Sequence, residues 1–380
     1  MADARPKVAL ILTGGGARAA YQVGVLRALA EIIPEAAGNP FPIICGTSAG
    51  AINAAALAAD AADFRRAVRR LMYVWKHFQV RDVYRADPWG AFYNSARWIL
   101  GVATGGLATR GPVSLLDNSP LGDLLRRYLD FSAIQRSIDD GHLTALSVTC
   151  SGYSSGQSVT FFQGQVALEP WQRARRIGVP MPITLEHLLA SSALPFIFPP
   201  VHINREYFGD GSMRQIAPVS PALHLGADRV LIVGTGRQTL DQARARSSIY
   251  PSLAQIAGHA LNSIFLDSLS VDIERLERIN RTVRMIPPER LEGSSLTLRP
   301  VKVLFITPSQ PIERIAARFI HDLPRSVRFI LRPTGALSRA GSNLASYLLF
   351  EESFCRALID LGYQDTLARA AEVKEFFSGA

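Results

Sequence analysis

The sequence predicts an α/β protein with a mainly parallel central sheet. Short apolar runs alternate along the chain with longer segments of helical periodicity, which is typical of parallel strands joined by crossover helices. Two of these runs end in glycine-rich turns, at residues 14–16 and 46–50, and a helical segment follows each turn. No internal repeat, heptad pattern or low-complexity tract indicates a different architecture.

The first part of the chain contains four predicted strands. Val8–Leu12 is an apolar run that leads into three consecutive glycines and then into a helix with one apolar side. Ile43–Cys45 is a second short strand, and an alanine-rich helix leads away from it toward Leu71. Thr144–Cys150 and Ser158–Phe162 are two further strands, and a Gly-Tyr-Ser-Ser-Gly turn joins them.

The C-terminal part is predicted to be mostly helical and packed on the same body. Arg229–Val233 is another buried strand, and Val301–Ile306 interrupts the later helical segments as one more. A loop rich in proline, glycine and serine lies near 287–300. Because no linker-like stretch separates this part from the rest, we expect it to share the same core.

Composition indicates an ordinary globular protein. Hydrophobic residues make up 48% of the 380 residues and charged residues 19%, which excludes a disordered chain. The three cysteines, Cys45, Cys150 and Cys355, are widely separated, which excludes a disulfide scaffold and a CxxC metal site. No signal peptide and no apolar run long enough to span a membrane is visible. We therefore expect a reduced, cytoplasmic protein.

The net charge of +9 suits an anionic partner, either a lipid surface or a nucleic acid. The basic residues are spread along the chain, however, and no helix-turn-helix, RRM or zinc-finger motif accompanies them. We therefore expect no nucleic-acid partner.

The pentapeptide Gly46-Thr47-Ser48-Ala49-Gly50 fits the pattern G-x-S-x-G between a strand and a helix. A nucleophile on such a sharp turn needs neighbours with little or no side chain, and the following helix N-terminus favours developing negative charge. An ordinary strand-to-helix turn capped by Ser48 is the alternative, because the pattern also occurs by chance. The pattern alone leaves both interpretations open.

The loop after the first strand carries backbone N–H groups that are able to converge on an anion. A dinucleotide fingerprint does not fit, because Ala19 stands at its third glycine position, and a Walker loop does not fit because Gly-Lys-Ser/Thr is missing. An oxyanion hole is the remaining option, with Arg18 adding positive potential or holding the loop. The candidate residues are Gly14, Gly15, Gly16, Ala17 and Arg18.

A third motif is Phe208-Gly209-Asp210-Gly211-Ser212, for which a hairpin turn is the ordinary interpretation. The order of the three motifs, together with the stretch Ala190–Pro200, resembles the patatin-like phospholipase family over roughly residues 6–220. The resemblance implies a three-layer α/β/α fold in that core. Residues 221–380, which the resemblance does not cover, are predicted from their own pattern to be a mostly helical C-terminal extension. The resemblance also implies hydrolysis of acyl esters, mostly in lipids, without a metal or cofactor.

The resemblance assigns roles to individual residues. It implies that Ser48 is the nucleophile and that Asp210 is its partner and base, in a dyad that replaces a triad. It implies an oxyanion hole from the backbone N–H groups of 14–18. Ser212 departs from the Asp-Gly-Gly or Asp-Gly-Ala that the family usually has at this turn. The supporting residues are Gly46, Thr47, Ala49 and Gly50 at the elbow and Gly211 and Ser212 at the dyad turn.

One other catalytic mechanism and several other functions stay open at this point. A Ser-Asp-His triad is compatible with chain order, since His224, His259 and His321 follow Asp210, but none lies in a recognisable loop motif. We interpret all seven histidines as structural. The same site also fits an acyltransferase or thioesterase, and the fold alone fits a regulatory or scaffold protein with little activity.

Residues 72–128 are rich in aromatic side chains, which fit either a lipid-binding cap or groove or an ordinary core. A helix after Asn118 is predicted to be amphipathic. Peripheral contact with an anionic membrane, at its inner face, is a hypothesis that rests on a row of arginines. The aromatic residues are Trp75, Phe78, Tyr84, Trp89, Phe92, Tyr93 and Trp98. The apolar residues of the helix are Leu121, Leu124, Leu125, Tyr128 and Leu129, and the arginines are Arg65, Arg66, Arg69 and Arg70.

Overall fold

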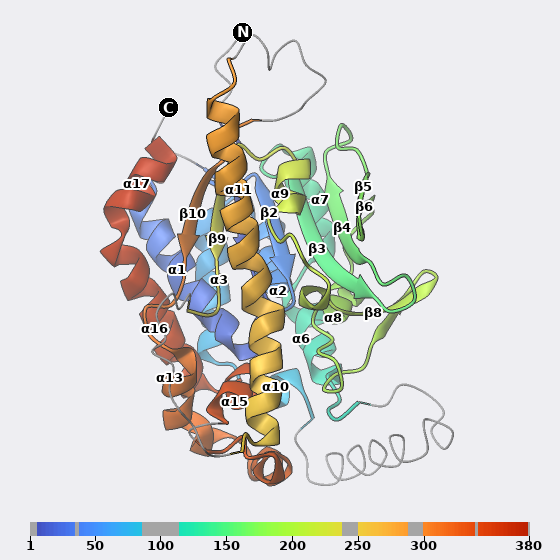
Figure 1. Cartoon of the computed structure of the whole chain (residues 1–380), viewed down its shortest axis with the longest axis vertical. Helices are drawn as coiled ribbons and strands as arrows, with labels where there is room; N and C mark the ends of the chain where they lie inside the picture. Colours follow the sequence, from blue (N-terminus) through green and yellow to red (C-terminus); the bar gives the residue numbers. More distant parts are fainter. Residues whose placement is uncertain are drawn as a thin grey trace.

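The computed structural model has a ten-stranded sheet at its centre with helices on both faces (Figure 1). The α/β class with a mostly parallel central sheet, predicted from the sequence, is therefore confirmed. The structure describes residues 6–34, 38–85, 114–237, 250–287, 299–338 and 341–378.

The sheet has the strand order β10-β9-β1-β2-β3-β4-β6-β5, and β8 pairs with both β3 and β7. β10, β9, β1, β2 and β3 run parallel to one another, whereas β4 and β8 run antiparallel to β3. The strands are β1 (Val8–Leu12), β2 (Ile43–Thr47), β3 (Ala145–Gly152), β4 (Ser158–Gly164), β5 (Trp171–Arg173), β6 (Arg176–Pro180), β7 (Val201–Ile203), β8 (Glu206–Asp210), β9 (Arg229–Val233) and β10 (Lys302–Ile306).

Strand β1 shows why the sheet needs a layer on each face. Val8, Leu10 and Leu12 belong to one hydrophobic cluster, and Ala9 and Ile11 belong to the other. Successive side chains of a strand point to opposite faces, so a strand that is apolar at every position must be buried on both. The first face carries α1 (Ala20–Ile32), α2 (Ala49–Ala59), α3 (Phe64–Lys76) and α16 (Glu352–Ala368); the second carries α9 (Ser220–His224) and α11 (Ser268–Arg284).

The C-terminal part joins the same sheet and the same core. β9 pairs with β1, and β10 pairs with β9. Helix α16 lies against α1 at a close crossing, where a Cβ at Gly24 would collide with the Ile359 carbonyl and a Cβ at Gly362 with the Tyr21 carbonyl. Each glycine thus allows the backbone of the other helix to approach, and the two ends of the chain pack as one unit.

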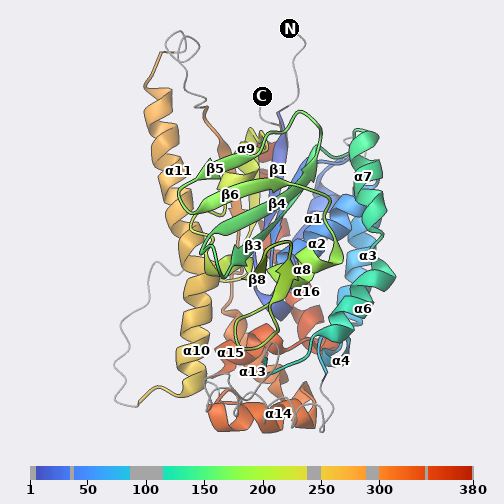
Figure 2. The ribbon, with the colours of Figure 1, turned by 90° about the vertical axis from the view of Figure 1, so that its right-hand side faces the viewer.

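The remaining helices cover the ends and sides of the sheet (Figure 2). Around the carboxyl ends of the parallel strands lie α10, α13, α14 and α15. Helix α7 packs against α2, and α6 packs against α4 and α8. The helices not yet given are α4 (Val80–Val83), α6 (Ser119–Tyr128), α7 (Phe131–Asp139), α8 (Leu185–Ser191), α10 (Leu253–Asn262), α13 (Ile312–Phe319), α14 (Arg325–Leu331), α15 (Ser342–Leu348) and α17 (Ala370–Ser378). Short 3-10 turns are η1 (Gly16–Ala19), η3 (Gly211–Met213), η5 (Ile320–Asp322) and η6 (Arg332–Thr334), and η4 (Ser263–Asp267) is a π-helical segment.

The structure corrects one expected element. The alanine-rich helix does not continue to Leu71 but ends at Ala59, and a new helix begins at Phe64. The reason is a local cap: the Asp63 side chain accepts a hydrogen bond from the Arg66 backbone N–H at 2.9 Å and so starts α3. The residues between Ala59 and Phe64 reverse the direction of the chain, so that α3 packs beside α2.

Of the seven aromatic residues singled out from the sequence, Trp89, Phe92, Tyr93 and Trp98 lie outside the described residues, as does most of the loop near 287–300. Within the described ranges, every helix is too short or too polar to cross a membrane.

Candidate active site

Two strands meet end to end along one edge of β3 and bring the sequence-predicted site residues together. β2 pairs with the first part of this edge, up to Thr47 opposite Thr149. β8 runs antiparallel to β3 and pairs with the last part, where Asp210 lies opposite Cys150. β4 occupies the other edge. The carboxyl ends of β2 and β8 therefore face each other, which is why Ser48 and Asp210 converge across 162 positions of sequence.

Ser48 has a strained backbone between β2 and α2. Its φ of 55° and ψ of −132° lie outside the conformations that residues with a side chain normally adopt. The flanking glycines let the turn pack tightly, because a Cβ at Gly46 would collide with the backbone of Ala51 and a Cβ at Gly50 with carbonyl groups at the end of β1. The G-x-S-x-G spacing thus has a steric cause here.

The Ser48 hydroxyl donates a hydrogen bond to Asp210 Oδ2 at 2.5 Å. Both residues are buried, with Asp210 fully shielded from solvent. The other carboxylate oxygen, Oδ1, accepts a hydrogen bond from the Ser212 backbone N–H at 2.9 Å. Because the backbone closes the turn, the serine at 212 in place of glycine or alanine is compatible with this geometry.

The buried position changes the acidity of the carboxyl group. Burial raises the pKa of Asp210 from its ordinary value of 3.8 to about 6, while hydrogen bonds from Ser48 and Ser212 oppose that rise. At neutral pH the carboxylate is ionised, yet it binds a proton far more readily than an exposed aspartate does. It is therefore suited to accept a proton from a serine hydroxyl.

Among the described residues, no histidine hydrogen-bonds to Ser48 or Asp210. His224 stacks on Trp171, and His259 and His321 are exposed on α10 and η5. The described ranges also contain no cluster of three or more histidine, cysteine or acidic side chains that is able to hold a metal ion. The three cysteines are unpaired and buried.

Ser191 is a residue of the site to which the sequence assigned no role, although it lies in the stretch Ala190–Pro200 that supports the resemblance. Its hydroxyl accepts a hydrogen bond from the Ser48 backbone N–H at 2.8 Å and donates one to the Thr149 carbonyl at 2.7 Å. Ser191 lies at the end of α8, inside the Ala-Ser-Ser-Ala-Leu-Pro stretch. It ties the strained turn to β3 and satisfies a buried backbone donor.

We expect Ser191→Ala to lower kcat by about tenfold with a smaller change in KM, and to destabilise the fold by about 1–3 kcal/mol, because it leaves the buried Ser48 N–H unpaired. Steady-state kinetics on a soluble ester and urea unfolding measure the two effects. Ser192→Ala is the matched control, since among the described residues that hydroxyl bonds to the Leu188 carbonyl of the preceding helical turn, at 2.8 Å. Equal losses in both variants would contradict a positioning role for Ser191.

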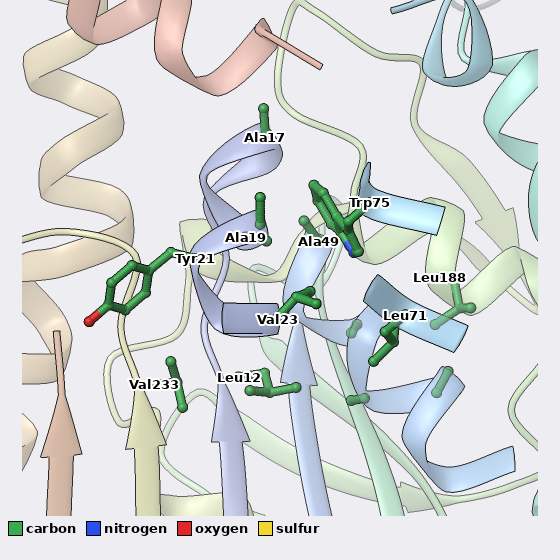
Figure 3. Close-up of a cluster of buried hydrophobic side chains, with 14 of the residues drawn as sticks. Leu12, Ala17, Ala19, Tyr21, Val23, Ala49, Leu71, Trp75, Leu188 and Val233 are labelled. Atoms are coloured by element: carbon green, nitrogen blue, oxygen red, sulfur yellow. The ribbon is translucent and has the colours of Figure 1, made fainter. Parts of the chain in front are cut away.

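The glycine-rich loop lies against the nucleophile turn and the dyad turn. A Cβ at Gly14 would come within 2.7 Å of the Ser212 hydroxyl and of the Phe265 ring. A Cβ at Gly16, where φ is 54°, would collide with the Tyr347 carbonyl. No described residue accepts a hydrogen bond from the backbone N–H groups of Gly14–Gly16. Figure 3 shows Ala17 on the helical turn that follows the end of β1.

Arg18 is buried, and its guanidinium contacts the C-terminal part. Its guanidinium donates to Ser346 Oγ at 2.7 Å, to Asn262 Oδ1 at 3.3 Å and to the Asn343 side chain, and it lies 3.9 Å from the centre of the Tyr347 ring. Of the two roles expected for it, holding the loop is the one its contacts support. They fix the glycine-rich loop to α15 and α10.

A buried chain of hydrogen bonds links the same loop to α3. Gln22 donates to the Thr13 carbonyl at 2.7 Å, Asn53 donates to Gln22 at 3.0 Å, and the Trp75 indole N–H donates to Asn53 at 2.8 Å. In a buried network every member must be satisfied, so the four groups fix one another's positions. Trp75 is thereby held where its side chain lines the same cavity as Ser48 and Ala49.

A cavity of about 340 Å³ extends from Ser48 between α2, α3 and α6. Gly16 and Ala49 line its inner end beside Ser48, and most of its wall is apolar. Such a volume and lining are typical of sites for apolar small molecules. The larger side chains of the wall are Ile52, Leu71, Val74, Trp75, Phe78, Leu121, Leu124, Leu125, Phe198, Tyr347 and Phe350.

Several aromatic, apolar and basic residues singled out from the sequence lie around this cavity. Trp75 and Phe78 line it, as does the apolar side of the amphipathic helix, now α6, whereas Tyr84 is buried and donates its hydroxyl to the Leu348 carbonyl. The four arginines all lie on α3, but they have different surroundings. Arg65 donates to the Ile33 carbonyl, but Arg66, Arg69 and Arg70 line the outer end of the cavity, where two of them pair with an aspartate.

A family model described as patatin-like phospholipase matches residues 10–223, a span that contains Ser48 and Asp210. Lysophospholipase nte1 of Aspergillus terreus is 56% identical over 54 residues, which are 14% of this chain and 3% of the fungal protein. The crystal structure of VipD from Legionella pneumophila aligns with 94% of this chain and 67% of its own, at 15% identity and a TM-score of 0.31.

Proposed function

The chain belongs to the patatin-like phospholipase family, and from that premise we propose that it is a serine acyl hydrolase that cleaves carboxylic ester bonds of lipids. The observation that carries the proposal is the Ser48 hydroxyl, hydrogen-bonded to a buried carboxylate at the inner end of an apolar cavity. Phospholipids, lysophospholipids and simpler acyl esters are the substrate class.

The proposed first half-reaction forms an acyl-enzyme. Ser48 Oγ attacks the ester carbonyl carbon while its proton passes to Asp210 Oδ2, which already accepts that proton's hydrogen bond. The carbonyl oxygen becomes an oxyanion. Collapse of the tetrahedral intermediate breaks the bond to the alcohol, and the leaving alkoxide takes the proton back from Asp210.

The second half-reaction regenerates the enzyme. Asp210 accepts a proton from water as the water oxygen attacks the acyl carbon of the Ser48 ester. When this second intermediate collapses, the proton returns to Ser48 Oγ and the fatty acid leaves. One carboxylate thus serves both steps, because its pKa of about 6 lies close enough to neutrality for it to take up and release a proton.

Oxyanion stabilisation is assigned to backbone N–H groups of the glycine-rich loop at 14–18. The proposal is supported by three features: the Gly14–Gly16 donors have no partner among the described residues, Gly16 lines the cavity beside Ser48, and Arg18 fixes the loop. Mutagenesis in other hydrolases indicates about 3–4 kcal/mol for one such donor.

The experiment that tests the function is incubation of the purified protein with a lysophospholipid and a diacyl phospholipid, with and without an acceptor alcohol, followed by analysis of the acyl products. Release of free fatty acid supports a hydrolase. Transfer of the acyl group to the alcohol in preference to water would replace it with the acyltransferase alternative. No product from a folded protein that also fails to react with a fluorophosphonate would favour the scaffold alternative.

A further inference from the structure

Three charged residues, Asp60, Arg66 and Arg70, line the apolar cavity beyond the last turn of α2, at the end of that helix away from Ser48, and are here called the Asp60 cluster. Asp60 Oδ1 lies 3.3 Å from Arg66 Nη2, and Oδ2 pairs with Arg70 Nη1. Arg70 Nη2 also donates to the Tyr128 carbonyl at 3.1 Å. The cluster therefore joins the ends of α2, α3 and α6, the three helices that form the cavity walls.

Up to the Asp60 cluster the cavity follows one side of α2. Ala49, Ile52, Ala56 and Ala59 line it at intervals of three or four residues, which places them on one face of the helix. Three of the four are alanines, and this leaves room for a chain-like ligand along the helix. At 1.5 Å per residue, the distance from the Ser48 end of α2 to the cluster is about 16 Å.

Beyond the Asp60 cluster the surroundings become polar. A second cavity, of about 300 Å³, shares all three cluster residues with the first. Its further wall carries charged side chains, among them Asp63 and Arg136. The cluster is thus the boundary between an apolar cavity that contains the nucleophile and a polar cavity that does not.

On the basis of the acyl hydrolase function proposed above, we propose that the Asp60 cluster sets the length of acyl chain for which this site is specific. With the carbonyl carbon held at Ser48, methylene groups up to the cluster leave water for an apolar wall. Each such group contributes roughly 0.8 kcal/mol, which is about a fourfold gain in kcat/KM. Methylene groups beyond the cluster would lie among charges and water and gain nothing.

The wild-type enzyme is therefore expected to show a break in its chain-length profile, which is the acyl-chain length beyond which kcat/KM no longer rises. With nitrophenyl esters from butyryl through octanoyl and dodecanoyl to stearoyl, kcat/KM should rise about fourfold per methylene and then level off. A profile that rises without a break through stearoyl would overturn the proposal.

The decisive variant is the triple replacement Asp60→Leu, Arg66→Met and Arg70→Met. It exchanges the ion pairs for apolar side chains of similar size. Because both arginines are largely exposed, the loss of the ion pairs is expected to cost little stability. The break should move to longer chains. Ala56→Leu, which places a larger side chain inside the cavity, should move it to shorter ones. Arg136→Met is the matched control, because Arg136 lines only the polar cavity and should leave the break in place.

A binding measurement separates this proposal from the proposed function. The same esters are titrated calorimetrically into Ser48→Ala and into Ser48→Ala combined with the triple replacement, both checked for fold by circular dichroism. A break in affinity that moves with the triple replacement supports the Asp60 cluster as the length stop even if the wild type cleaves no ester. A break that stays in place while the wild type hydrolyses esters overturns the length stop alone.

Discussion

Ser48→Ala is expected to lower ester hydrolysis by on the order of 10⁴-fold or more and to abolish labelling by a fluorophosphonate. Both reactions need an oxygen nucleophile with a base beside it that accepts its proton. Asp210 Oδ2, which lies 2.5 Å from Ser48 Oγ, is that base in the proposed dyad. Alanine keeps the strained turn but removes the oxygen. Residual activity then comes only from binding and oxyanion stabilisation.

The same substitution carries a prediction for stability. The hydroxyl of Ser48 lowers the pKa of Asp210, so its loss raises that pKa further above the unfolded value. A carboxyl group whose pKa is higher in the folded state than in the unfolded state destabilises the fold when it is ionised. The free energy of unfolding therefore falls as the pH rises from the unfolded-state pKa through the folded-state pKa. We therefore expect Ser48→Ala to lose more unfolding free energy at pH 8 than at pH 5.

Labelling in gel, steady-state kinetics and urea unfolding at both pH values check these outcomes. Ser192→Ala serves as the control, because it removes a nearby buried hydroxyl that does not contact Asp210. Persistent labelling of Ser48→Ala would identify another serine as the nucleophile and overturn the dyad.

The sequence predicted those parts of the site that depend on local backbone geometry. A turn with φ of 55° at Ser48 needs small neighbours in fixed positions, so Gly46 and Gly50 leave a recognisable spacing. The same holds for the loop at 14–16, where glycines are required because the backbone approaches Tyr347 and Phe265. Such requirements are visible in one stretch of chain.

The residues that join these motifs left no such signal. Ser191 and Gln22 act through hydrogen bonds to backbone and side-chain groups elsewhere in the chain, which fix no spacing in the sequence. Asn53 was visible only as a polar interruption of an alanine-rich run. The structure explains the polar residue at this position: the buried Asn53 side chain donates a hydrogen bond to Gln22 and accepts one from the Trp75 indole N–H.

The role of the C-terminal part also depends on long-range packing. Phe265 and Tyr347 stack at 5.3 Å between ring centres, and one packs on Gly14 while the other lies under Arg18. Phe265 lies in the π-helical segment η4, a kind of helix defect that occurs frequently at functional sites. Aromatic residues in a helical sequence fit a core equally well, so periodicity alone could not distinguish this support from ordinary packing.

Asp210→Asn is expected to reduce kcat/KM by on the order of 10⁴-fold while making the fold more stable at neutral pH. Asparagine is nearly isosteric, and its oxygen can accept from the Ser212 N–H while its NH₂ group donates to Ser48 Oγ. The turn is therefore kept, but the side chain no longer accepts the serine proton. The variant separates base catalysis from the shape of the site.

The pH dependence follows from the pKa of Asp210, about 6 in the folded protein against an ordinary 3.8. Activity requires the carboxylate, so wild-type kcat/KM should rise through about pH 6 and level off above it. Stability has the opposite slope, because between the two pKa values the folded state binds more protons than the unfolded state. Ionised Asp210 thus costs about 3 kcal/mol at pH 7, at about 1.4 kcal/mol per pKa unit.

Asparagine does not titrate, so the stability gain of Asp210→Asn over the wild type should approach 3 kcal/mol at pH 7 and shrink toward pH 4. Urea unfolding across this range, beside pH–rate profiles, measures both slopes on the same proteins. If Asp210→Asn retained activity within tenfold of the wild type, a base outside the dyad would have to act on Ser48. A gain in stability together with loss of activity would instead identify the buried carboxylate as a group that destabilises the fold and is retained for proton transfer.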